Sequence, residues 1–191
     1  MNVTLLRHGA TARPGIYAGR LDVPLAAAGR AAMWQATRGL QVQRVVSSPL
    51  SRCRLFAEAL AERHGLALTV EPAWQEMDFG DWEGRTAAEI LAQAPETLEA
   101  FWRDPETHAP PGGEGLADLR RRVLSAWERR PRDADLLIIT HGGPMRLLFQ
   151  HLLGLPGESL WRLELHPAAR IDFVLDEGGP RLTQFHFGKG H

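Results

Sequence analysis

The sequence has only one cysteine, Cys53, among its 191 residues. A single cysteine cannot form an internal disulfide or a cysteine-rich metal site, so a reducing compartment is expected. No apolar run approaches the roughly 20 residues that a membrane-spanning helix needs. The chain also begins without the basic and then apolar pattern of a secretory leader, and runs directly into Arg7 and His8. These absences predict a cytoplasmic protein without a membrane partner.

No charge of one sign dominates the chain. Lys and Arg number 22, Asp and Glu number 23, and the formal net charge is -1. Balanced charge argues against nucleic acid and anionic membranes as partners, because both recruit strongly basic surfaces. A length of 191 residues with 44% hydrophobic residues is enough for one compact core. We therefore predict a single domain over residues 1–191.

Segments typical of strands alternate with segments typical of helices along much of the chain. Strands are expected near residue 185 and at residues 2–6, 42–46, 67–70, 136–140, 160–165 and 171–175. Helices are expected at residues 27–38, 49–63, 86–93, 95–103, 116–129 and 142–153. This alternation predicts an α/β fold with a sheet covered on both faces, and residues 74–130 are expected to form in part a small cap-like insertion.

Four basic side chains follow expected strands or begin expected helices: Arg7, His8, Arg52 and His141. In α/β sheets, ligands collect at the carboxyl ends of the strands, and helix N-termini favour anions. Two arginines can also present planar arrays of N–H donors to phosphoryl oxygens. The sequence therefore predicts a phosphate site at this edge of the sheet.

His8 is the candidate nucleophile of this site. A neutral imidazole offers a lone pair when its other nitrogen is held by a hydrogen bond. We expect a backbone carbonyl just beyond His8 to accept from Nδ1, which leaves Nε2 for in-line attack. His141 is expected to stabilise charge on the equatorial oxygens. Because uncatalysed hydrolysis of phosphomonoesters is extremely slow, such positioned charge is required. The hypothesis is a metal-independent phosphomonoester hydrolase with a phosphohistidine intermediate.

The leaving alkoxide needs a proton donor, and the loop at residues 74–84 offers Glu76, Asp78, Asp81 and Glu83. A carboxyl group beside a bound phosphate dianion is pushed towards its protonated form, so it can act first as acid and then as base for water. Residue types alone do not separate these four side chains, because many loop carboxylates are simply solvated. Glu76 is our choice, on the resemblance described next.

Four blocks of sequence resemble the ordered motifs of the histidine phosphatase superfamily. They are residues 6–11 (LRHGAT), 47–52 (SSPLSR), 75–84 (QEMDFGDWEG) and 140–143 (THGG). The resemblance spans the chain from Leu6 to about Leu155. Within the superfamily, the third block and residues 113–115 (GEG) are most similar to the α-ribazole-5′-phosphate phosphatases of cobalamin synthesis.

The resemblance implies a three-layer α/β/α sandwich with a mostly parallel central sheet and a small helical cap insertion. It implies that His8 is the nucleophile, that Glu76 is the proton donor, and that the substrate is a small phosphate ester, without cofactor or metal. The implied substrate-binding residues are Arg7, Thr11, Arg52, His141 and Gly142. The resemblance leaves open whether the protein forms a homodimer.

Two positions depart from the family's pattern. Many members have an asparagine where this chain has Pro14, and a glutamine where it has Ala18. Two phosphate donors are thus missing, which weakens the case for a generic sugar-phosphate phosphatase or mutase. The alternatives are a phosphatase or phosphoglycerate mutase for another small ester, a non-catalytic phosphate-binding module, and a metallohydrolase.

Other conspicuous side chains are expected to be structural. Aromatic residues at such spacing usually belong to the core, adjacent arginines usually form the solvated face of a helix, and two histidines without further ligands are a weak metal site. These residues are Trp74, Phe79, Trp82, Arg120–Arg122, His186 and His191.

Overall fold

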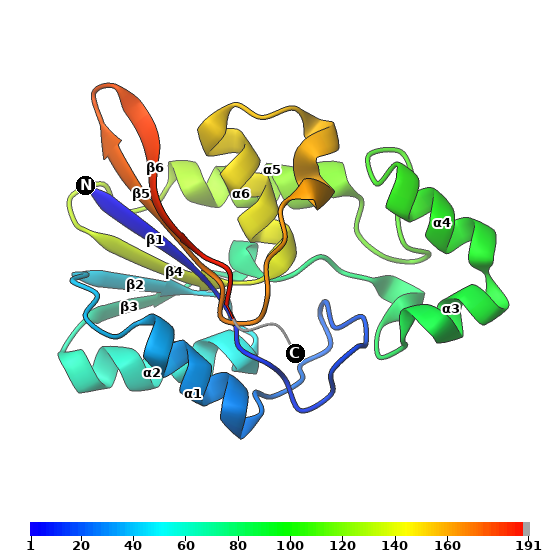
Figure 1. The fold of residues 1–191 in the computed structure, drawn as a ribbon, viewed down its shortest axis with the longest axis horizontal. Helices are drawn as coiled ribbons and strands as arrows, with labels where there is room; N and C mark the ends of the chain where they lie inside the picture. The colour runs from blue at the N-terminus through cyan, green and yellow to red at the C-terminus, as the bar shows by residue number, and fades with distance from the viewer. Residues whose placement is uncertain (189–191) are drawn as a thin grey trace.

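A six-stranded sheet with the strand order β3-β2-β4-β1-β5-β6 forms the centre of the molecule (Figure 1). The computed structural model describes residues 1–188, apart from the side chains of residues 158, 159 and 161. The strands are β1 (Asn2–Arg7), β2 (Arg44–Ser47), β3 (Ala67–Val70), β4 (Leu136–Thr140), β5 (Arg170–Asp176) and β6 (Gly179–His186). The first four are parallel to one another, while β5 and β6 run antiparallel to their neighbours. The predicted mostly parallel α/β sheet is confirmed.

Helices cover both faces of this sheet (Figure 1). The helices are α1 (Ala27–Ala36), α2 (Ser51–His64), α3 (Ala87–Gln93), α4 (Pro95–Arg103), α5 (Leu116–Glu128) and α6 (Gly142–Leu153). Side chains alternate across a strand, so Leu5 and Ile138 pack with α5 and α6. Leu6 and Ile139 face the other way and pack with α1 and α2. The result is the expected three-layer sandwich.

Helices α3 and α4 lie away from the sheet (Figure 1). The helix α3 begins with the predicted capping box between Thr86 and Glu89. Residues 72–82 contain two short 3-10 helices, η1 (Pro72–Trp74) and η2 (Gly80–Trp82), in the segment expected to be an ordered loop. No helix among the described residues has the length and apolar character to cross a bilayer. The extent of the cap and the one-domain organisation stay predictions.

The structure corrects three expectations. Residues 160–165 do not form a strand, because they contain the end of a 3-10 helix, η3 (Gly157–Arg162), and irregular backbone. The helix α2 begins two residues later than expected, with Leu50 at its N-cap. Arg122, expected on a solvated helix face, is only 18% exposed at its side chain. The burial of Arg122 arises from hydrogen bonds to backbone carbonyls at residues 73–76, which are distant in sequence.

Candidate active site

The ends of β1 and β4 bring the two predicted histidines together. The parallel register pairs Arg7 with Thr140, and the backbone N–H of His8 donates to the carbonyl of Thr140 at 3.0 Å. His8 and His141 follow directly, and their ring centroids are 5.1 Å apart. His8 is 9% exposed and His141 is fully buried. The expectation that both imidazoles meet at one edge of the sheet is confirmed.

The His8 ring is held in one tautomer. Its Nδ1 lies 2.8 Å from the carbonyl oxygen of Gly9, and a carbonyl can only accept, so Nδ1 carries the proton. Burial, and then the positive charges of Arg7 and Arg52, lower the pKa of His8 well below its ordinary value. The ring is therefore neutral at pH 7, and Nε2 retains the lone pair that the sequence analysis required.

The loop after His8 passes very close to α1. A Cβ atom built on Gly9 would lie 2.1 Å from the carbonyl oxygen of Gly29, and one built on Gly29 would lie 2.1 Å from that of Ala10. Real Cβ contacts are never that short, so both positions require glycine. The close approach fixes the backbone carbonyl that holds the His8 ring.

His141 is oriented by two polar side chains. Arg52 Nε donates to His141 Nδ1 at 3.2 Å, so the proton of the neutral ring lies on Nε2, which is 2.7 Å from Ser48 Oγ. Ser48 thus contacts the site, while the N-cap of α2 is Leu50 and has no side-chain capping hydrogen bond. Burial, followed by the charge of Arg52, lowers the pKa of His141 well below its ordinary value. Two neutral imidazoles therefore lie side by side.

Arg52 lies behind His141 and is fully buried. Its Nη2 donates to the carbonyl oxygens of Ala18 and Gly19 at 2.8 and 2.7 Å, and its Nη1 donates to that of Leu21 at 2.9 Å. The guanidinium thus joins the loop at residues 18–21 to the second histidine. Direct contact between Arg52 and a phosphate stays a prediction.

Arg7 has a buried donor without a partner. Its Nη1 donates to the carbonyl of Leu165, whereas its Nε is buried and makes no hydrogen bond. An unsatisfied buried donor costs about 1–3 kcal/mol. Burial lowers the pKa of Arg7, but an arginine keeps its charge at neutral pH. A bound anion in the neighbouring cavity would satisfy this N–H group.

A cavity of about 370 Å³ opens beside these groups. Of the predicted site residues, it is lined by Arg7, His8, Thr11, Glu76 and Gly142, and not by Arg52 or His141. Pro14 and Ala18, which replace polar residues of the family, also line it. Their apolar side chains therefore leave part of the cavity without hydrogen-bond donors.

The structure separates the four acidic residues of the 74–84 loop, because only Glu76 lines the cavity. Its Oε1 accepts from the backbone N–H of Met77 at 2.9 Å, and both carboxylate oxygens accept from that of Gly143 at 3.1 and 3.2 Å. Gly143 is in the first turn of α6, where free N–H groups favour negative charge.

The other three acidic residues are placed elsewhere. Asp78 accepts from the N–H of Gly80 at 2.9 Å, and Asp81 is exposed. Glu83 accepts hydrogen bonds from four backbone N–H groups, those of Gly19, Arg20, Leu21 and Phe79. Since Glu83 fixes the backbone of residues 19–21, it supports the carbonyls that hold Arg52.

Sequence reasoning missed several residues of the cavity wall, among them Arg13, Arg146 and Tyr17. Arg146 lines the cavity, and its Nε donates to the carbonyl of Leu163 at 3.0 Å. Its spacing of four residues from Gly142, which is one helical turn, was the available signal. Phe79 was assigned to the core, yet it lines the cavity together with Tyr17, with their ring centroids 4.9 Å apart.

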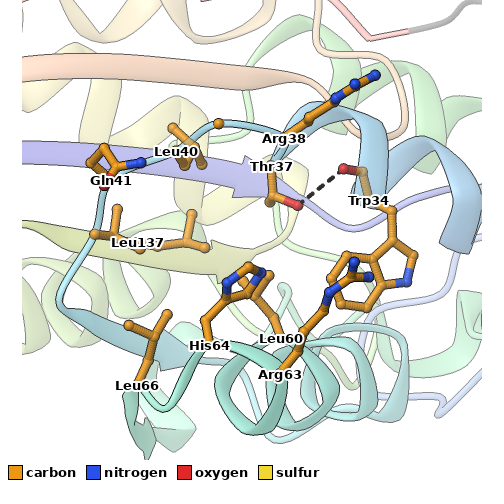
Figure 2. A pocket seen from close by; sticks show the side chains of 12 residues that line it. Trp34, Thr37, Arg38, Leu40, Gln41, Leu60, Arg63, His64, Leu66 and Leu137 are labelled. Carbon is orange, nitrogen blue, oxygen red and sulfur yellow. Dashed lines mark hydrogen bonds between the residues drawn. The ribbon is translucent and has the colours of Figure 1, made fainter.

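A second cavity, of about 500 Å³, lies between the end of α1 and the end of α2 (Figure 2). Its walls include Trp34, Leu60, Arg63 and His64. None of the predicted site residues lines it, so its larger volume does not make it the candidate site. Within residues 1–188, no group of three or more His, Cys, Asp or Glu side chains is arranged to hold a metal ion, and His191 lies outside the described residues.

Comparison with known proteins identifies relatives that span nearly the whole chain. The family model of the histidine phosphatase superfamily (branch 1) matches residues 3–187. The chain is 32% identical over 186 residues to the adenosylcobalamin/alpha-ribazole phosphatase of Salmonella typhimurium, covering 93% of this chain and 92% of that protein. It is 36% identical over 198 residues to the glucosyl-3-phosphoglycerate phosphatase of Mycobacterium tuberculosis, covering 90% and 88%. The crystal structure of the alpha-ribazole phosphatase from Shigella flexneri superimposes with a TM-score of 0.84 at 26% identity, covering 100% and 99%. The chain is a phosphatase that belongs to the histidine phosphatase superfamily.

Proposed function

We propose that the chain hydrolyses small phosphomonoesters through a phosphohistidine formed on His8. The observation that carries this proposal is the state of the His8 ring. Its Nδ1–H is held by the carbonyl of Gly9, the ring is neutral, and it lines a cavity that is also lined by Arg7, whose buried Nε is unpaired. Nucleophile and anion-binding donor are therefore prepared before substrate arrives.

In the first step, the lone pair on His8 Nε2 attacks phosphorus, and a P–N bond forms as the P–O bond to the leaving group breaks. The leaving oxygen takes a proton from the carboxyl group of Glu76, and the alcohol departs. Arg7 neutralises charge on the phosphoryl oxygens. His141 lies beside His8, but its Nε2–H donates to Ser48 and the residue does not line the cavity, so its contact with the phosphoryl oxygens stays a prediction. This step needs no group beyond the side chains described.

In the second step, water attacks the phosphorus of phosphohistidine. The Glu76 carboxylate accepts a proton from that water, the P–N bond breaks, and the electron pair returns to His8 Nε2. Inorganic phosphate and the starting enzyme result. The same carboxyl group thus serves as acid and then as base, as the two half-reactions require.

We propose α-ribazole 5′-phosphate as the substrate, which would place the enzyme in cobalamin biosynthesis. Similarity to the adenosylcobalamin/alpha-ribazole phosphatase supports this choice. A second support is the apolar part of the cavity wall, formed by Ile16, Tyr17, Met77, Phe79, Leu116, Leu119 and Leu160. Such a surface suits the flat aromatic base of α-ribazole, since aromatic rings pack favourably in offset or edge-on contacts.

A second candidate substrate is glucosyl-3-phosphoglycerate, because a relative with 36% identity is named a glucosyl-3-phosphoglycerate phosphatase. Arg13 and Arg146 line the cavity in addition to Arg7. Extra guanidinium groups favour a substrate with a carboxylate besides its phosphate. The two candidates therefore differ in whether the apolar wall or the additional arginines determine specificity.

Trapping the intermediate tests the mechanism. Enzyme mixed with ³²P-labelled α-ribazole 5′-phosphate and quenched in denaturant should carry a label that is stable in alkali, lost in acid and located on His8. The variant His8→Ala should carry none. A label on any other residue, or an acid-stable label, contradicts the proposed intermediate.

A substrate panel tests the specificity. We expect kcat/KM for α-ribazole 5′-phosphate to exceed that for glucosyl-3-phosphoglycerate, 3-phosphoglycerate and p-nitrophenyl phosphate. If glucosyl-3-phosphoglycerate is the best substrate, the second candidate replaces the first. A panel in which α-ribazole 5′-phosphate is hydrolysed no faster than p-nitrophenyl phosphate excludes the first candidate.

A further inference from the structure

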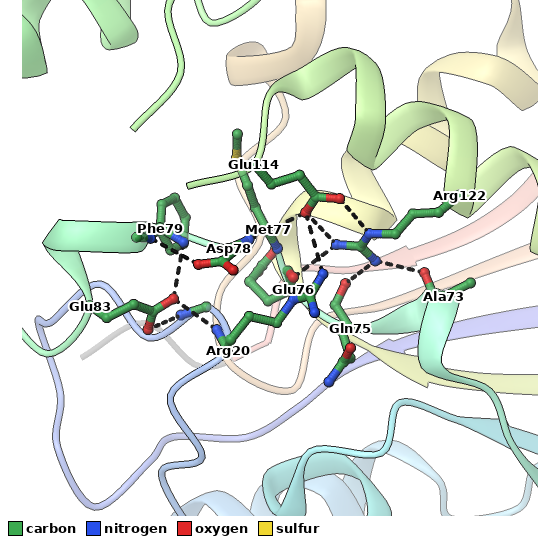
Figure 3. Close-up of polar contacts among 12 residues, drawn as sticks. Arg20, Ala73, Gln75, Glu76, Met77, Asp78, Phe79, Glu83, Glu114 and Arg122 are labelled. Carbon is green, nitrogen blue, oxygen red and sulfur yellow. Dashed lines mark hydrogen bonds and ion pairs between the residues drawn. The ribbon is translucent and has the colours of Figure 1, made fainter. Parts of the chain in front are cut away.

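The loop that carries Glu76 is held from outside the cavity by a largely buried ion pair (Figure 3). Arg122 of α5 contacts Glu114, which lies in the loop before that helix. Nε donates to Oε1 and Nη2 donates to Oε2, both at 2.7 Å. The two side chains are 18% and 11% exposed. This planar two-bond geometry is the most specific one available to an arginine and a carboxylate.

The remaining donors of Arg122 go to the loop itself. Nη1 donates to the carbonyl oxygens of Ala73 and Gln75 at 2.8 and 2.7 Å, and Nη2 donates to that of Glu76 at 2.9 Å. All five N–H groups of the guanidinium are therefore used. Because the guanidinium is rigid and planar, three carbonyls within four residues have fixed relative positions.

Glu114 holds the other side of Glu76. Its Oε2 accepts from the backbone N–H of Asp78 at 3.3 Å, and its own backbone N–H donates to the carbonyl of Asp78 at 2.9 Å. The backbone is thus fixed before, at and after Glu76. The Glu76 carboxylate is held independently, by the N–H of Gly143 in α6. Its position depends on α5 through the backbone and on α6 through the side chain.

Neither Arg122 nor Glu114 lines the cavity, so neither is placed to contact phosphate. The two neighbours of Arg122 in α5 differ from it. Arg121 is 75% exposed and pairs with Asp118, and Arg120 pairs with Glu106. Arg122 alone of the three arginines donates to the 73–76 backbone. It therefore has a role that its exposed neighbours lack.

We propose that Arg122 and Glu114 are positioning residues for Glu76, and that they set the distance between its carboxyl group and the leaving oxygen. This inference rests on the proposed role of Glu76 as proton donor. Proton transfer requires heavy atoms about 2.6–3.2 Å apart, and a misplacement of about 1 Å can cost a factor of about 10². Removing the guanidinium leaves three carbonyls without this donor and takes two hydrogen bonds from Glu114, so the Glu76 backbone moves while the phosphate-binding groups stay in place.

The experiment compares esters whose leaving groups need an acid to different degrees. Variants Arg122→Met, Arg122→Lys and Glu114→Gln are assayed with α-ribazole 5′-phosphate, which has a poor alkoxide leaving group, and with p-nitrophenyl phosphate, which has a good one. The inhibition constant of inorganic phosphate reports the state of the anion site. Arg121→Met is the matched control.

We expect Arg122→Met to lower kcat/KM about 10²-fold with α-ribazole 5′-phosphate and less than about threefold with p-nitrophenyl phosphate. The measure is kcat/KM because it covers the formation of phosphohistidine, whereas kcat also contains its hydrolysis, in which Glu76 is the base for both esters. Phosphate inhibition should be unchanged. Arg122→Lys should fall between this variant and the wild type, because lysine keeps the charge but lacks the planar donors. Arg121→Met should behave as the wild type.

Glu76→Gln and the double variant Glu76→Gln/Arg122→Met separate the role of Glu76 as proton donor from the positioning role of Arg122. If Glu76→Gln lowers kcat/KM equally for both esters, the proposed proton donor is wrong. If Glu76→Gln is selective for the poor leaving group but Arg122→Met lowers kcat/KM equally for both esters, only the positioning role is overturned. Additive losses in the double variant overturn it as well, since residues that act through one group are not additive. Should Arg122→Met fail to fold, the ratio of the two rates in Arg122→Lys and Glu114→Gln decides.

Discussion

Mild acid should destabilise the fold through its two buried imidazoles. His8 and His141 have pKa values lowered well below the ordinary value of 6.5, chiefly by burial. In the unfolded chain, both rings titrate near that ordinary value. Below it the unfolded state binds more protons than the folded state, so the free energy of unfolding falls as the pH is lowered. The loss continues until the pH reaches the folded-state pKa.

The size of the effect follows from proton linkage. For a ring that stays neutral when folded and titrates at about 6.5 when unfolded, lowering the pH from about 7.5 to 5.5 removes between about 1 and 2 kcal/mol. The two rings together account for about 3 kcal/mol. About 2 kcal/mol of this loss falls between pH 6.5 and 5.5. That is a large part of the 5–15 kcal/mol typical of a domain.

Urea unfolding at about pH 7.5, 6.5 and 5.5 measures this loss. The buffer must be free of phosphate, because a bound anion would add stability of its own. The double variant His8→Asn/His141→Asn is the comparison, since asparagine does not titrate while all other ionisable groups are retained. The wild type should lose about 3 kcal/mol more than the variant over this range. Equal losses in the two proteins would refute the assignment of both rings as buried and neutral.

Three further predictions concern single residues. Arg7→Met should raise the inhibition constant of inorganic phosphate at least about tenfold, since a hydrogen bond to a charged group contributes about 1.5–3 kcal/mol. An unchanged inhibition constant would show that the unpaired Nε does not contact the anion. Tyr17→Ala should raise KM for α-ribazole 5′-phosphate several-fold while phosphate inhibition stays the same. The reason is that the ring forms part of the apolar wall, and aromatic contacts contribute about 0.5–1.5 kcal/mol. Equal effects on KM and on the phosphate inhibition constant would assign Tyr17 to the anion site. Gly9→Ala should lower the free energy of unfolding by about 1–3 kcal/mol, because its Cβ would lie 2.1 Å from the Gly29 carbonyl oxygen. If the variant unfolds in urea as the wild type does, the loop can shift to accommodate the methyl group.

The positions of the two histidines were predictable from local sequence. The strand β4 has the bounds expected from its apolar run, and all five of its residues are buried. A buried strand ends abruptly where polar residues follow, so His8 and His141 were expected at the carboxyl ends of strands. The parallel pairing of β1 with β4, which the sequence did not predict, then brings the two rings together.

Contacts between distant segments explain what the sequence did not reveal. Arg122 looks like its solvated neighbours until the carbonyls of residues 73–76, some fifty positions earlier, surround it. Leu160 and Leu165 suggested a strand because they are apolar, yet both are buried without strand pairing. Ser48 has the character of an N-cap, but its hydroxyl contacts His141. Local patterns identify which residues are polar or apolar, and not which partner they find.

The choice of Glu76 among four acidic residues needed either the family resemblance or the structure. All four lie within eight residues of one loop, so spacing alone does not separate them. Separation comes from the direction in which each backbone turn sends its side chain: Glu76 meets the start of α6, and Glu83 meets the loop at residues 18–21. Such turns have no periodic signature in sequence.

The mutual contact between Gly9 and Gly29 has a consequence for anyone who wishes to alter the substrate range of this enzyme. Behind the nucleophile, main chain touches main chain, and no substitution can enlarge or reshape that wall without moving the imidazole itself. Other parts of the cavity wall are built from side chains, among them those of Pro14, Tyr17 and Phe79. Libraries aimed at new leaving groups should therefore vary these side chains and leave the contact between Gly9 and Gly29 intact.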